Sequence, residues 1–364
     1  MNDLESIEKI HSLYARLTDQ AARIIVGQEN VLEELVIALL AGGHCLLEGV
    51  PGLAKTLMIR TLSRTLSLEF QRIQCTPDLM PADITGSEIF QLPGNAPASA
   101  AEVSGTESAG VSEKSGNAGA MRFMRGPVFT NILLADEINR TPPRTQSALL
   151  EAMQEHQVTV GRRRFPLPEP FFVLATQNPI EQEGTYPLPE AQLDRFMLKS
   201  LVTYPNRQEE LDILLKTTGE TPPEIESVLT QEELQEAMRL VRRVPVARPV
   251  AEFALDLCRA TRPSRNAEGE KSLAENFGTD LTAFINEYAA WGAGPRAGQA
   301  LLLGSRARAI LYGRFCVERE DVRALAHAVL RHRIQTRFSA DAEGITPDQI
   351  VTKILNSLEN LRKV

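Results

Sequence analysis

The sequence contains the segment Gly49-Val50-Pro51-Gly52-Leu53-Ala54-Lys55-Thr56, which follows an apolar run at 45–47 and precedes Leu57-Met58-Ile59. An apolar strand, a glycine-containing loop and a helix that starts near Lys55 are typical of a phosphate-binding loop. Glycines let successive backbone N–H groups surround phosphates, while the helix N-terminus and the lysine ammonium add positive charge. The segment therefore predicts a nucleoside-triphosphate site, in which Thr56 would bind Mg²⁺ through its hydroxyl group.

One position departs from the usual G-x-x-x-x-G-K-[ST] pattern, because Ala54 replaces the second glycine. We expect Ala54 to have right-handed helical backbone angles, at which a methyl group costs little free energy. The alternative is a glycine-containing turn that precedes Lys-Thr by chance.

The composition is that of a globular protein. The chain has 364 residues, enough for two domains, with 43% apolar and 24% charged residues. The formal net charge of −8 disfavours nucleic acid as a partner. The N-terminus lacks a basic region followed by an apolar core, and no apolar run approaches the length of a membrane span. We therefore expect a cytoplasmic protein with no membrane span.

The four cysteines, Cys45, Cys75, Cys258 and Cys316, are far apart and have no histidines at ligand spacing. This pattern indicates neither a disulfide framework nor a zinc site. We expect them to be small buried apolar residues.

The first half of the chain alternates helical and strand patterns. Apolar residues recur at helical spacing over 4–24, 31–40 and 145–154, and strands are predicted near 45–47, 69–73, 132–135 and 171–176. The run Ile132-Leu133-Leu134-Ala135 is apolar throughout, as in strands that are buried on both faces of a parallel sheet. The alternation predicts a three-layer α/β domain over residues 1–205.

Two segments interrupt this domain. Residues 93–120 are almost all small or polar and include no aromatic residue, so they can bury too little surface to offset the entropy of ordering. We expect a flexible insertion here, carried by an ordered hairpin or helix. A second, short hairpin is predicted from 157–160 and 163–167, with its turn at Gly161-Arg162.

Helical patterns dominate from residue 206 to 364. Thr230 and Glu233 have the spacing of a capping box, and Thr346-Pro347 is typical of a helix start. Apolar residues recur every three or four positions over 250–260, 295–312 and 319–332. These patterns predict a second, helical domain, in which the polar passage 264–278 indicates another loop insertion.

Asp136 and Glu137 directly follow the apolar strand and fit a second nucleotide motif. Asp136 would hold Mg²⁺ through its water shell, because this cation keeps several waters and takes only one or two carboxylates. Glu137 would orient and activate the attacking water. An acidic pair after a strand can also be a solvated turn, but the upstream phosphate loop favours the catalytic interpretation.

Three further residues are candidates. Asn178 follows the third core strand, where ligands gather in open α/β sheets, and its amide could orient the water or contact the γ-phosphate. Without that position it would be a turn residue before Pro179. Arg195 and Arg296 are, in isolation, typical of surface ion-pair residues.

Taken together, these segments resemble the MoxR group of AAA+ ATPases, a helix-2-insert clade related to magnesium chelatase ATPase subunits. The resemblance covers nearly the whole chain apart from the two insertions, and it implies a P-loop α/β core followed by an all-α lid. The motifs that carry it are Gly49 to Thr56, Thr76-Pro77-Asp78-Leu79-Met80-Pro81-Ala82-Asp83-Ile84-Thr85-Gly86, Asp136-Glu137-Ile138-Asn139-Arg140, Thr176-Gln177-Asn178-Pro179, Leu193-Asp194-Arg195-Phe196 and Gly294-Pro295-Arg296.

The resemblance also implies roles for single residues. Lys55 and Thr56 would be the Walker A pair, Asp136 and Glu137 the Walker B pair, Asn178 sensor 1 and Arg296 sensor 2. Arg195 would be the arginine finger that reaches the next subunit's site, a contribution worth about 10³-fold or more in rate. The residues expected to contact ATP are Val26, Gly27, Gly49, Val50, Pro51, Gly52, Leu53, Ala54, Lys55, Thr56, Leu57 and Asp136.

The implied function is a Mg²⁺-dependent ATPase that forms a homo-oligomeric ring, expected to be a hexamer. It would use ATP hydrolysis to remodel or mature a partner protein, or to insert a metal cofactor into it. A partner with a von Willebrand factor A domain is implied by the same resemblance, and the client is not identified.

Two alternatives stay open. One is an ATP-gated binding scaffold with negligible hydrolysis. The other is a DNA-dependent motor, in which Arg162-Arg163-Arg164 would grip nucleic acid instead of pairing with acidic residues of a neighbouring subunit.

Overall fold

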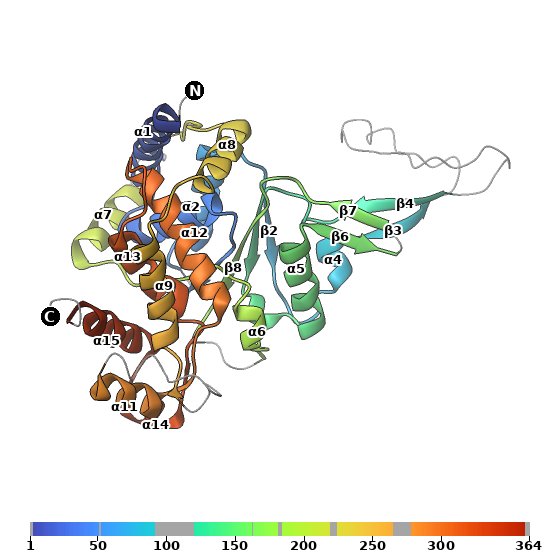
Figure 1. Cartoon of the computed structure of the whole chain (residues 1–364). Helices are drawn as coiled ribbons and strands as arrows, with labels where there is room; N and C mark the ends of the chain where they lie inside the picture. The colour runs from blue at the N-terminus through green and yellow to red at the C-terminus, as the bar shows by residue number, and fades with distance from the viewer. Residues whose placement is uncertain are drawn as a thin grey trace.

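Five parallel strands form the central sheet of the computed structural model (Figure 1). Their order is β2-β5-β8-β1-β9, and their bounds are β1 Cys45–Glu48, β2 Phe70–Gln74, β5 Ile132–Asp136, β8 Phe172–Gln177 and β9 Leu198–Leu201. The structure describes residues 3–50, 52–91, 120–161, 163–180, 184–218, 224–264 and 278–360. The sheet and the helical region after it confirm the predicted α/β fold.

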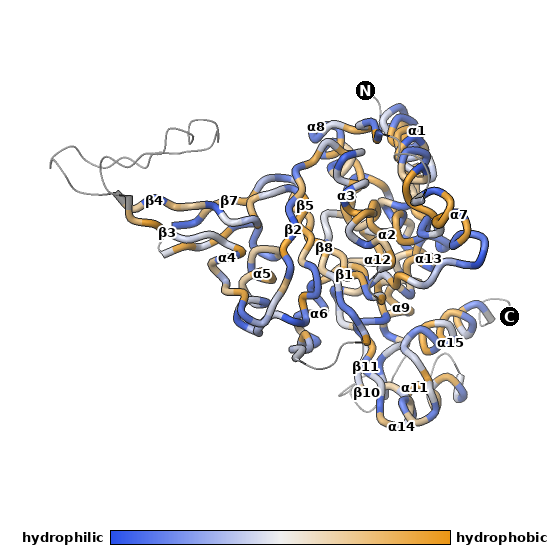
Figure 2. Tube along the Cα trace, turned by 180° about the vertical axis from the view of Figure 1, so that it is seen from behind, coloured by the Kyte–Doolittle hydropathy of each residue, from blue (hydrophilic) through white to orange (hydrophobic). Residues whose placement is uncertain are grey.

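Alternate residues of the central strands enter two hydrophobic cores, one on each face of the sheet. Leu46 and Leu133 belong to the core that contains the buried side chains of α5 (Pro143–Glu155). Leu47 and Leu134 belong to the core on the opposite face. Because both faces are covered, the strands are apolar at consecutive positions, as the hydropathy colouring of β5 shows (Figure 2).

The larger core joins the first three helices to helices from the second half of the chain. On the early side are α1 (Asp3–Ala22), α2 (Glu29–Leu40) and α3 (Lys55–Thr65). The later helices that share this core are α8 Gln231–Val241, α9 Arg248–Ala260, α11 Thr279–Tyr288, α12 Pro295–Leu311, α13 Arg319–Leu330, α14 Phe338–Glu343 and α15 Pro347–Asn360. The boundary between residues 205 and 206 stays a prediction.

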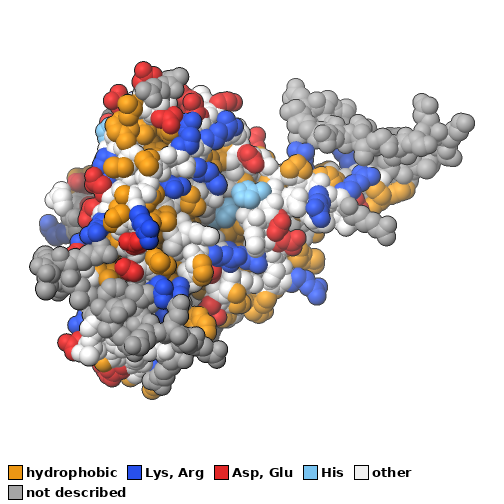
Figure 3. Space-filling view, in the orientation of Figure 1, with side chains coloured by type: hydrophobic (Ala, Val, Ile, Leu, Met, Phe, Trp, Pro, Cys, Tyr) orange, Lys and Arg blue, Asp and Glu red, His pale blue; other side chains and the backbone are white. Residues whose placement is uncertain are grey.

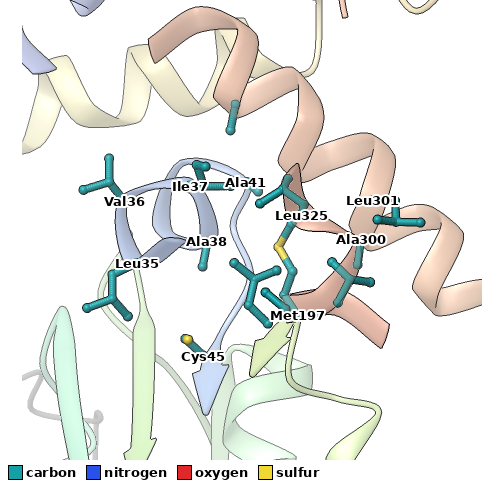
Figure 4. Close-up of a cluster of buried hydrophobic side chains, with 14 of the residues drawn as sticks. Leu35, Val36, Ile37, Ala38, Ala41, Cys45, Met197, Ala300, Leu301 and Leu325 are labelled. Carbon is teal, nitrogen blue, oxygen red and sulfur yellow. The ribbon is translucent and has the colours of Figure 1, made fainter. Parts of the chain in front are cut away.

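A close contact within this core places Met197 between α2, α12 and α13 (Figure 4). A Cβ added to Gly304 of α12 would lie 2.7 Å from Leu325, 3.1 Å from Met197 and 3.5 Å from Ile37. The missing side chain at Gly304 therefore lets three elements meet at this point.

The helix caps agree with the sequence pattern. Thr230 accepts a hydrogen bond from the backbone N–H of Glu233, whose carboxylate accepts one from the backbone N–H of Thr230. The hydroxyl of Thr346 likewise accepts from the backbone N–H of Gln349 at the start of α15. A further capped helix, α7 (Arg207–Thr217), follows β9.

The helical prediction for the second half missed one feature, a two-stranded antiparallel sheet. It consists of β10 (Ala289–Trp291) and β11 (Gln335–Thr336). Strands of two or three residues are too short to show a hydrophobic period, so the sequence carried no signal for them.

Two hairpins form an arm that projects from the core (Figure 1). β3 (Gly86–Gln91) follows the short helix α4 (Pro81–Thr85) and pairs with β4 (Ala120–Arg125), while β6 (Gln157–Val160) pairs with β7 (Arg163–Pro166). The rings of Phe123 and Phe165 stack between the hairpins with centroids 4.2 Å apart. The flanks of the predicted insertion thus form a hairpin. The insertion lies outside the described residues except for Ala120, as does the polar passage within 264–278 except at its ends.

Cys45, Cys75 and Cys258 are buried as predicted, but Cys316 is exposed. That prediction was wrong because Cys316 lies in the loop between α12 and α13, outside either core. Among the helices that the structure describes, none has the length and apolarity needed to cross a bilayer.

Candidate functional site

The phosphate-loop segment lies between β1 and α3, as predicted. A Cβ at Gly49 would lie 2.6 Å from the carbonyl oxygen of Val202, so only glycine fits beside β9. Gly52 has a φ of +85° and open space around it, whereas Pro51 lies outside the described residues. The loop can therefore bring its backbone close to a ligand.

Lys55 is the first residue of α3, and its Nζ donates a hydrogen bond to the carbonyl oxygen of Gly49 at 2.6 Å. Burial lowers the pKa of Lys55, while the nearby carboxylates of Asp136, Glu137 and Glu48 act to raise it. The ammonium group is thus half-buried beside the acidic pair, folded back on its own loop.

Ala54 does not have the expected backbone conformation. Its φ of +54° and ψ of +20° lie in the left-handed region, so the expectation of right-handed helical angles was wrong. Ala54 is the cap residue before Lys55, where the chain turns from the loop into α3. This geometry explains why glycine is usual at the position, since a Cβ is strained there.

Thr176 of β8 joins the two carboxylate residues to the sheet. Its hydroxyl donates to Asp136 Oδ1 at 2.6 Å and accepts from the backbone N–H of Glu137 at 2.8 Å. Glu137 itself has left-handed angles, φ +58° and ψ +51°, directly after β5. Strained backbone of this kind concentrates at functional sites.

Three polar residues hold the acidic pair: Arg72 and Gln74, which sequence reasoning missed, and Arg140, which ends the quoted motif that starts at Asp136. Arg72 donates from Nη2 to Asp136 Oδ2 at 2.6 Å. Glu137 Oε2 accepts from Gln74 Nε2 at 3.0 Å and from Arg140 Nη1 at 3.2 Å. Arg72 and Gln74 alternate on β2, and Gln74 is the register partner of Asp136. Only the alternation was visible in the sequence, because the pairing of β2 with β5 is a property of the fold.

Asn178 follows β8, which lies between β1 and β5, so its position is at the same edge of the sheet as the loop and the acidic pair. It is 4% exposed, and its Oδ1 accepts from the backbone N–H of Ile180 at 3.2 Å. An amide in this place can contact a ligand that occupies the edge.

Val26 and Gly27 lie beside the chain that leaves β9. The neighbouring Gln28 donates from Nε2 to the carbonyl oxygen of Thr203 at 3.1 Å. Gly27 has a φ of +75°, and an added Cβ would lie 2.5 Å from the carboxylate of Glu209. Because Val202 contacts Gly49, the Val26-Gly27 segment is near the same end of the phosphate loop.

Arg195 lies elsewhere. It lines a surface hollow formed by α5, the β6–β7 hairpin and α6 (Glu190–Leu193), together with residues that include Glu151, Glu155 and Arg164. Among the described residues, no hydrogen bond or ion pair joins Arg195 to Lys55, Asp136 or Glu137. The hollow that Arg195 lines thus does not include Lys55, Asp136 or Glu137.

Arg296 is in the first turn of α12, and its Nη1 lies 3.5 Å from Asp194 Oδ2. Asp194 also binds Arg333, a buried residue that the sequence gave no reason to select. The arginine pair Arg195 and Arg296 is therefore connected through the residue next to Arg195.

His44 has a structural environment. His44 is buried, with Nδ1 accepting from the backbone N–H of Val173 at 3.1 Å and Nε2 donating to the carbonyl oxygen of Met153 at 3.0 Å.

In the part of the chain that the structure describes, no group of three or more His, Cys, Asp or Glu side chains is placed to bind a metal. The hydroxyl of Thr56 and the carboxylate of Asp136 are, however, hard oxygen donors of the kind that suits Mg²⁺ with bound waters.

Known proteins are similar to this chain in both sequence and fold. A sequence model of the ATPase family associated with various cellular activities (AAA) matches residues 44–97 and 99–198, and one of the AAA lid domain matches residues 282–354. Chaperone MoxR1 of Mycobacterium tuberculosis is 39% identical over 96% of this chain and 82% of its own length. Protein MoxR of Methylorubrum extorquens is 28% identical over 92% of each chain.

A crystal structure is also similar. It is that of a Cytophaga hutchinsonii protein named for an inferred ATPase activity, with 37% sequence identity and a TM-score of 0.81. The superposition covers 97% of this chain and 96% of the other.

Proposed function

Because the chain belongs to the MoxR family of AAA ATPases, we propose that it is a Mg²⁺-dependent ATPase that assembles into a ring and remodels a partner protein. The observation that carries the proposal is the meeting of the Lys55 loop, the Asp136–Glu137 pair and Asn178 at one edge of the sheet. A triphosphate bound there would have a cation, two carboxylates and an amide within one small region.

Each of these residues has a separate role in the proposal. Lys55 would exchange its hydrogen bond to Gly49 for the terminal phosphates. Thr56 and Asp136 would hold Mg²⁺, which when bound neutralises charge on the phosphate oxygens. Glu137 would accept a proton from the attacking water, with its carboxylate oriented by Gln74 and Arg140.

The position of Arg195 away from the phosphate loop supports the ring in this proposal. Its guanidinium is at a different surface, beside α5 and the arm, so it would act on the nucleotide of an adjacent subunit. We propose a hexamer by analogy with the family. Hydrolysis in this scheme needs at least two subunits for each complete site.

The remodelling role is supported by the name of the relative Chaperone MoxR1 and by the surface of the arm. Ile89, Phe90, Met121 and Met124 expose 43–59% of their surface on β3 and β4. Basic side chains lie among hydrophobic ones along this arm (Figure 3). An exposed apolar surface of this kind suits contact with another protein. The client, a von Willebrand factor A domain partner and a metal-insertion role belong to the proposal by family analogy.

Phosphate release at steady state over a range of protein concentrations tests the proposal. Specific activity should rise as subunits assemble, and Glu137→Gln should lower turnover by roughly 10²–10⁴-fold while ATP binding is retained. Glu252→Gln, on the exposed surface of α9, is the matched control and should behave like the wild type. A flat, near-zero line for the wild type would instead identify an ATP-gated scaffold, and retained turnover in Glu137→Gln would contradict the role of Glu137.

A further inference from the structure

Arg333, in the loop after α13, uses every N–H group of its guanidinium. Nε donates to Asp194 Oδ1 at 2.8 Å, and Nη2 donates to the carbonyl oxygens of Asp194 and Phe196 at 3.2 and 2.7 Å. Nη1 donates to the carbonyl oxygens of Met197 and Val329 at 3.1 and 2.5 Å. Five donors thus meet five acceptors, a match that only arginine can make.

Four of these five acceptors belong to residues 194–197, the segment that carries Arg195. The side chain of Arg333 is 3% exposed, so water cannot replace these contacts. The end of the segment is anchored as well, because Met197 packs between α2, α12 and α13 (Figure 4). The backbone on both sides of Arg195 is therefore fixed to the helices of the second half, while its own side chain stays at the hollow beside α5.

The carboxylate of Asp194 connects two arginines. Its Oδ1 binds Arg333, and its Oδ2 lies 3.5 Å from Nη1 of Arg296, which is half exposed. A movement of α12 would change the distance between Arg296 and Asp194 and so the charge next to that carboxylate. Asp194, which is next to Arg195, thus contacts both the first turn of α12 and the loop after α13.

We propose that Arg333 is a positioning residue that couples the lid helices to Arg195. A movement of the lid in one subunit would then change the position of the Arg195 guanidinium that this subunit presents to its neighbour. The inference rests on the proposed function, in which Arg195 acts on the adjacent subunit. It assigns to Arg333 and Asp194 the connection between the helices of the second half and the residue that would reach the next subunit's nucleotide.

Mixed rings test this coupling. A Glu137→Gln subunit cannot activate water but can donate its finger, and an Arg195→Ala subunit has a complete site but no finger. Each protein alone should be inactive, and mixing them should restore phosphate release. Arg333→Lys is then added to the Glu137→Gln subunit, the finger donor. Lysine keeps the positive charge but lacks the planar guanidinium that makes the five hydrogen bonds. The recovered activity should fall about tenfold or more, since a misplacement of ~1 Å in a catalytic group can lower the rate about 10²-fold.

Arg331→Lys in the donor is the matched control. Arg331 also ties the second half to the sheet, through the carbonyl oxygen of Lys199 in β9 at 3.0 Å. Its Nε binds Asp348 of α15 at 3.0 Å, and no hydrogen bond joins it to the described residues 194–197. It should leave the recovered activity within about twofold. Hydrogen–deuterium exchange of nucleotide-free single variants gives a second readout, with faster exchange at 194–197 in Arg333→Lys and unchanged exchange in Arg331→Lys.

The outcomes separate the two levels of proposal. No recovery with the parent donor overturns action in trans and this inference with it. Recovery that Arg333→Lys leaves intact, or unchanged exchange at 194–197, overturns the coupling alone. If the Arg333→Lys donor does not bind ATP or assemble, an Asp194→Asn donor replaces it, and full recovery with that donor also overturns the coupling.

Discussion

The backbone angles of Ala54 are set by the turn from the phosphate loop into α3. Its left-handed angles cost an L-residue roughly 1–2 kcal/mol. Ala54→Gly removes this strain from the folded protein. Glycine also makes the unfolded chain more flexible, which lowers the free energy of unfolding by roughly 0.4–1 kcal/mol. We therefore predict that Ala54→Gly raises the free energy of unfolding of the nucleotide-free protein by about 0.5–1 kcal/mol, measured by urea denaturation.

The control for this prediction is the same substitution in an ordinary helix. Ala251 lies within α9, where glycine should lower the free energy of unfolding by about 1 kcal/mol. The two substitutions should thus have opposite signs. Equal destabilisation by both would show that Ala54 is not strained.

At this scale the sequence predicts residues whose chemistry is tied to a local pattern. Lys55 and Asp136 follow strands, and their spacing from glycines or apolar runs identifies them. Arg72, Gln74 and Arg333 could not be found in this way, because their partners are brought to them by strand order and helix packing. The conformation of Ala54 was also predicted wrongly, since the pattern fixes residue type but not φ.

Among the elements, the contact between α5 and the sheet depends on a neutral histidine. Burial lowers the pKa of His44 from its ordinary value of 6.5 to about 4. Between these values the unfolded chain binds a proton that the folded protein does not, so stability present above pH 6.5 is lost as the pH falls. This one group should remove about 2 kcal/mol from the free energy of unfolding between pH 7.5 and pH 5.

Denaturation of the wild type and His44→Gln at both pH values checks this. Glutamine keeps a donor and an acceptor but does not titrate, so the acid-induced loss should be smaller by about that amount. Burial also lowers the pKa of His332, and it raises the pKa of Glu34, which acts in the opposite direction. Both groups are present in both proteins and cancel in the comparison. Equal losses would contradict the role of His44.

Long elements were predictable because their hydrophobic period repeats. α9 and α12 lie within a few residues of the ranges predicted from apolar spacing, and β5 was expected from an unbroken apolar run. β10 and β11 are too short for any period. The strand order could not be derived either, since it depends on which buried faces meet.

For the whole molecule, the two cores divide by the faces of the sheet and not by the predicted domain boundary. α1 and α2 come from the first 205 residues, yet they share one core with α9, α12 and α13. Leu35, Ile37 and Leu39 of α2 are at most 2% exposed in that core. The helices of the second half therefore help to stabilise the first 205 residues through this shared core.

This arrangement predicts that a fragment of residues 1–205 does not fold stably alone. Each buried side chain exposed by the cut costs about 1.5–3 kcal/mol, and several such losses exceed the usual stability of a domain. The fragment should show no cooperative unfolding transition by circular dichroism, and coexpression with residues 206–364 should restore one. Gly304 gives a milder comparison, because Gly304→Ala disturbs only the contact with Met197 and Leu325 and should cost about 1–3 kcal/mol in the intact chain. A fragment that unfolds cooperatively with near-native stability would mean that the shared core contributes little, and that the lid is free to move as a separate body.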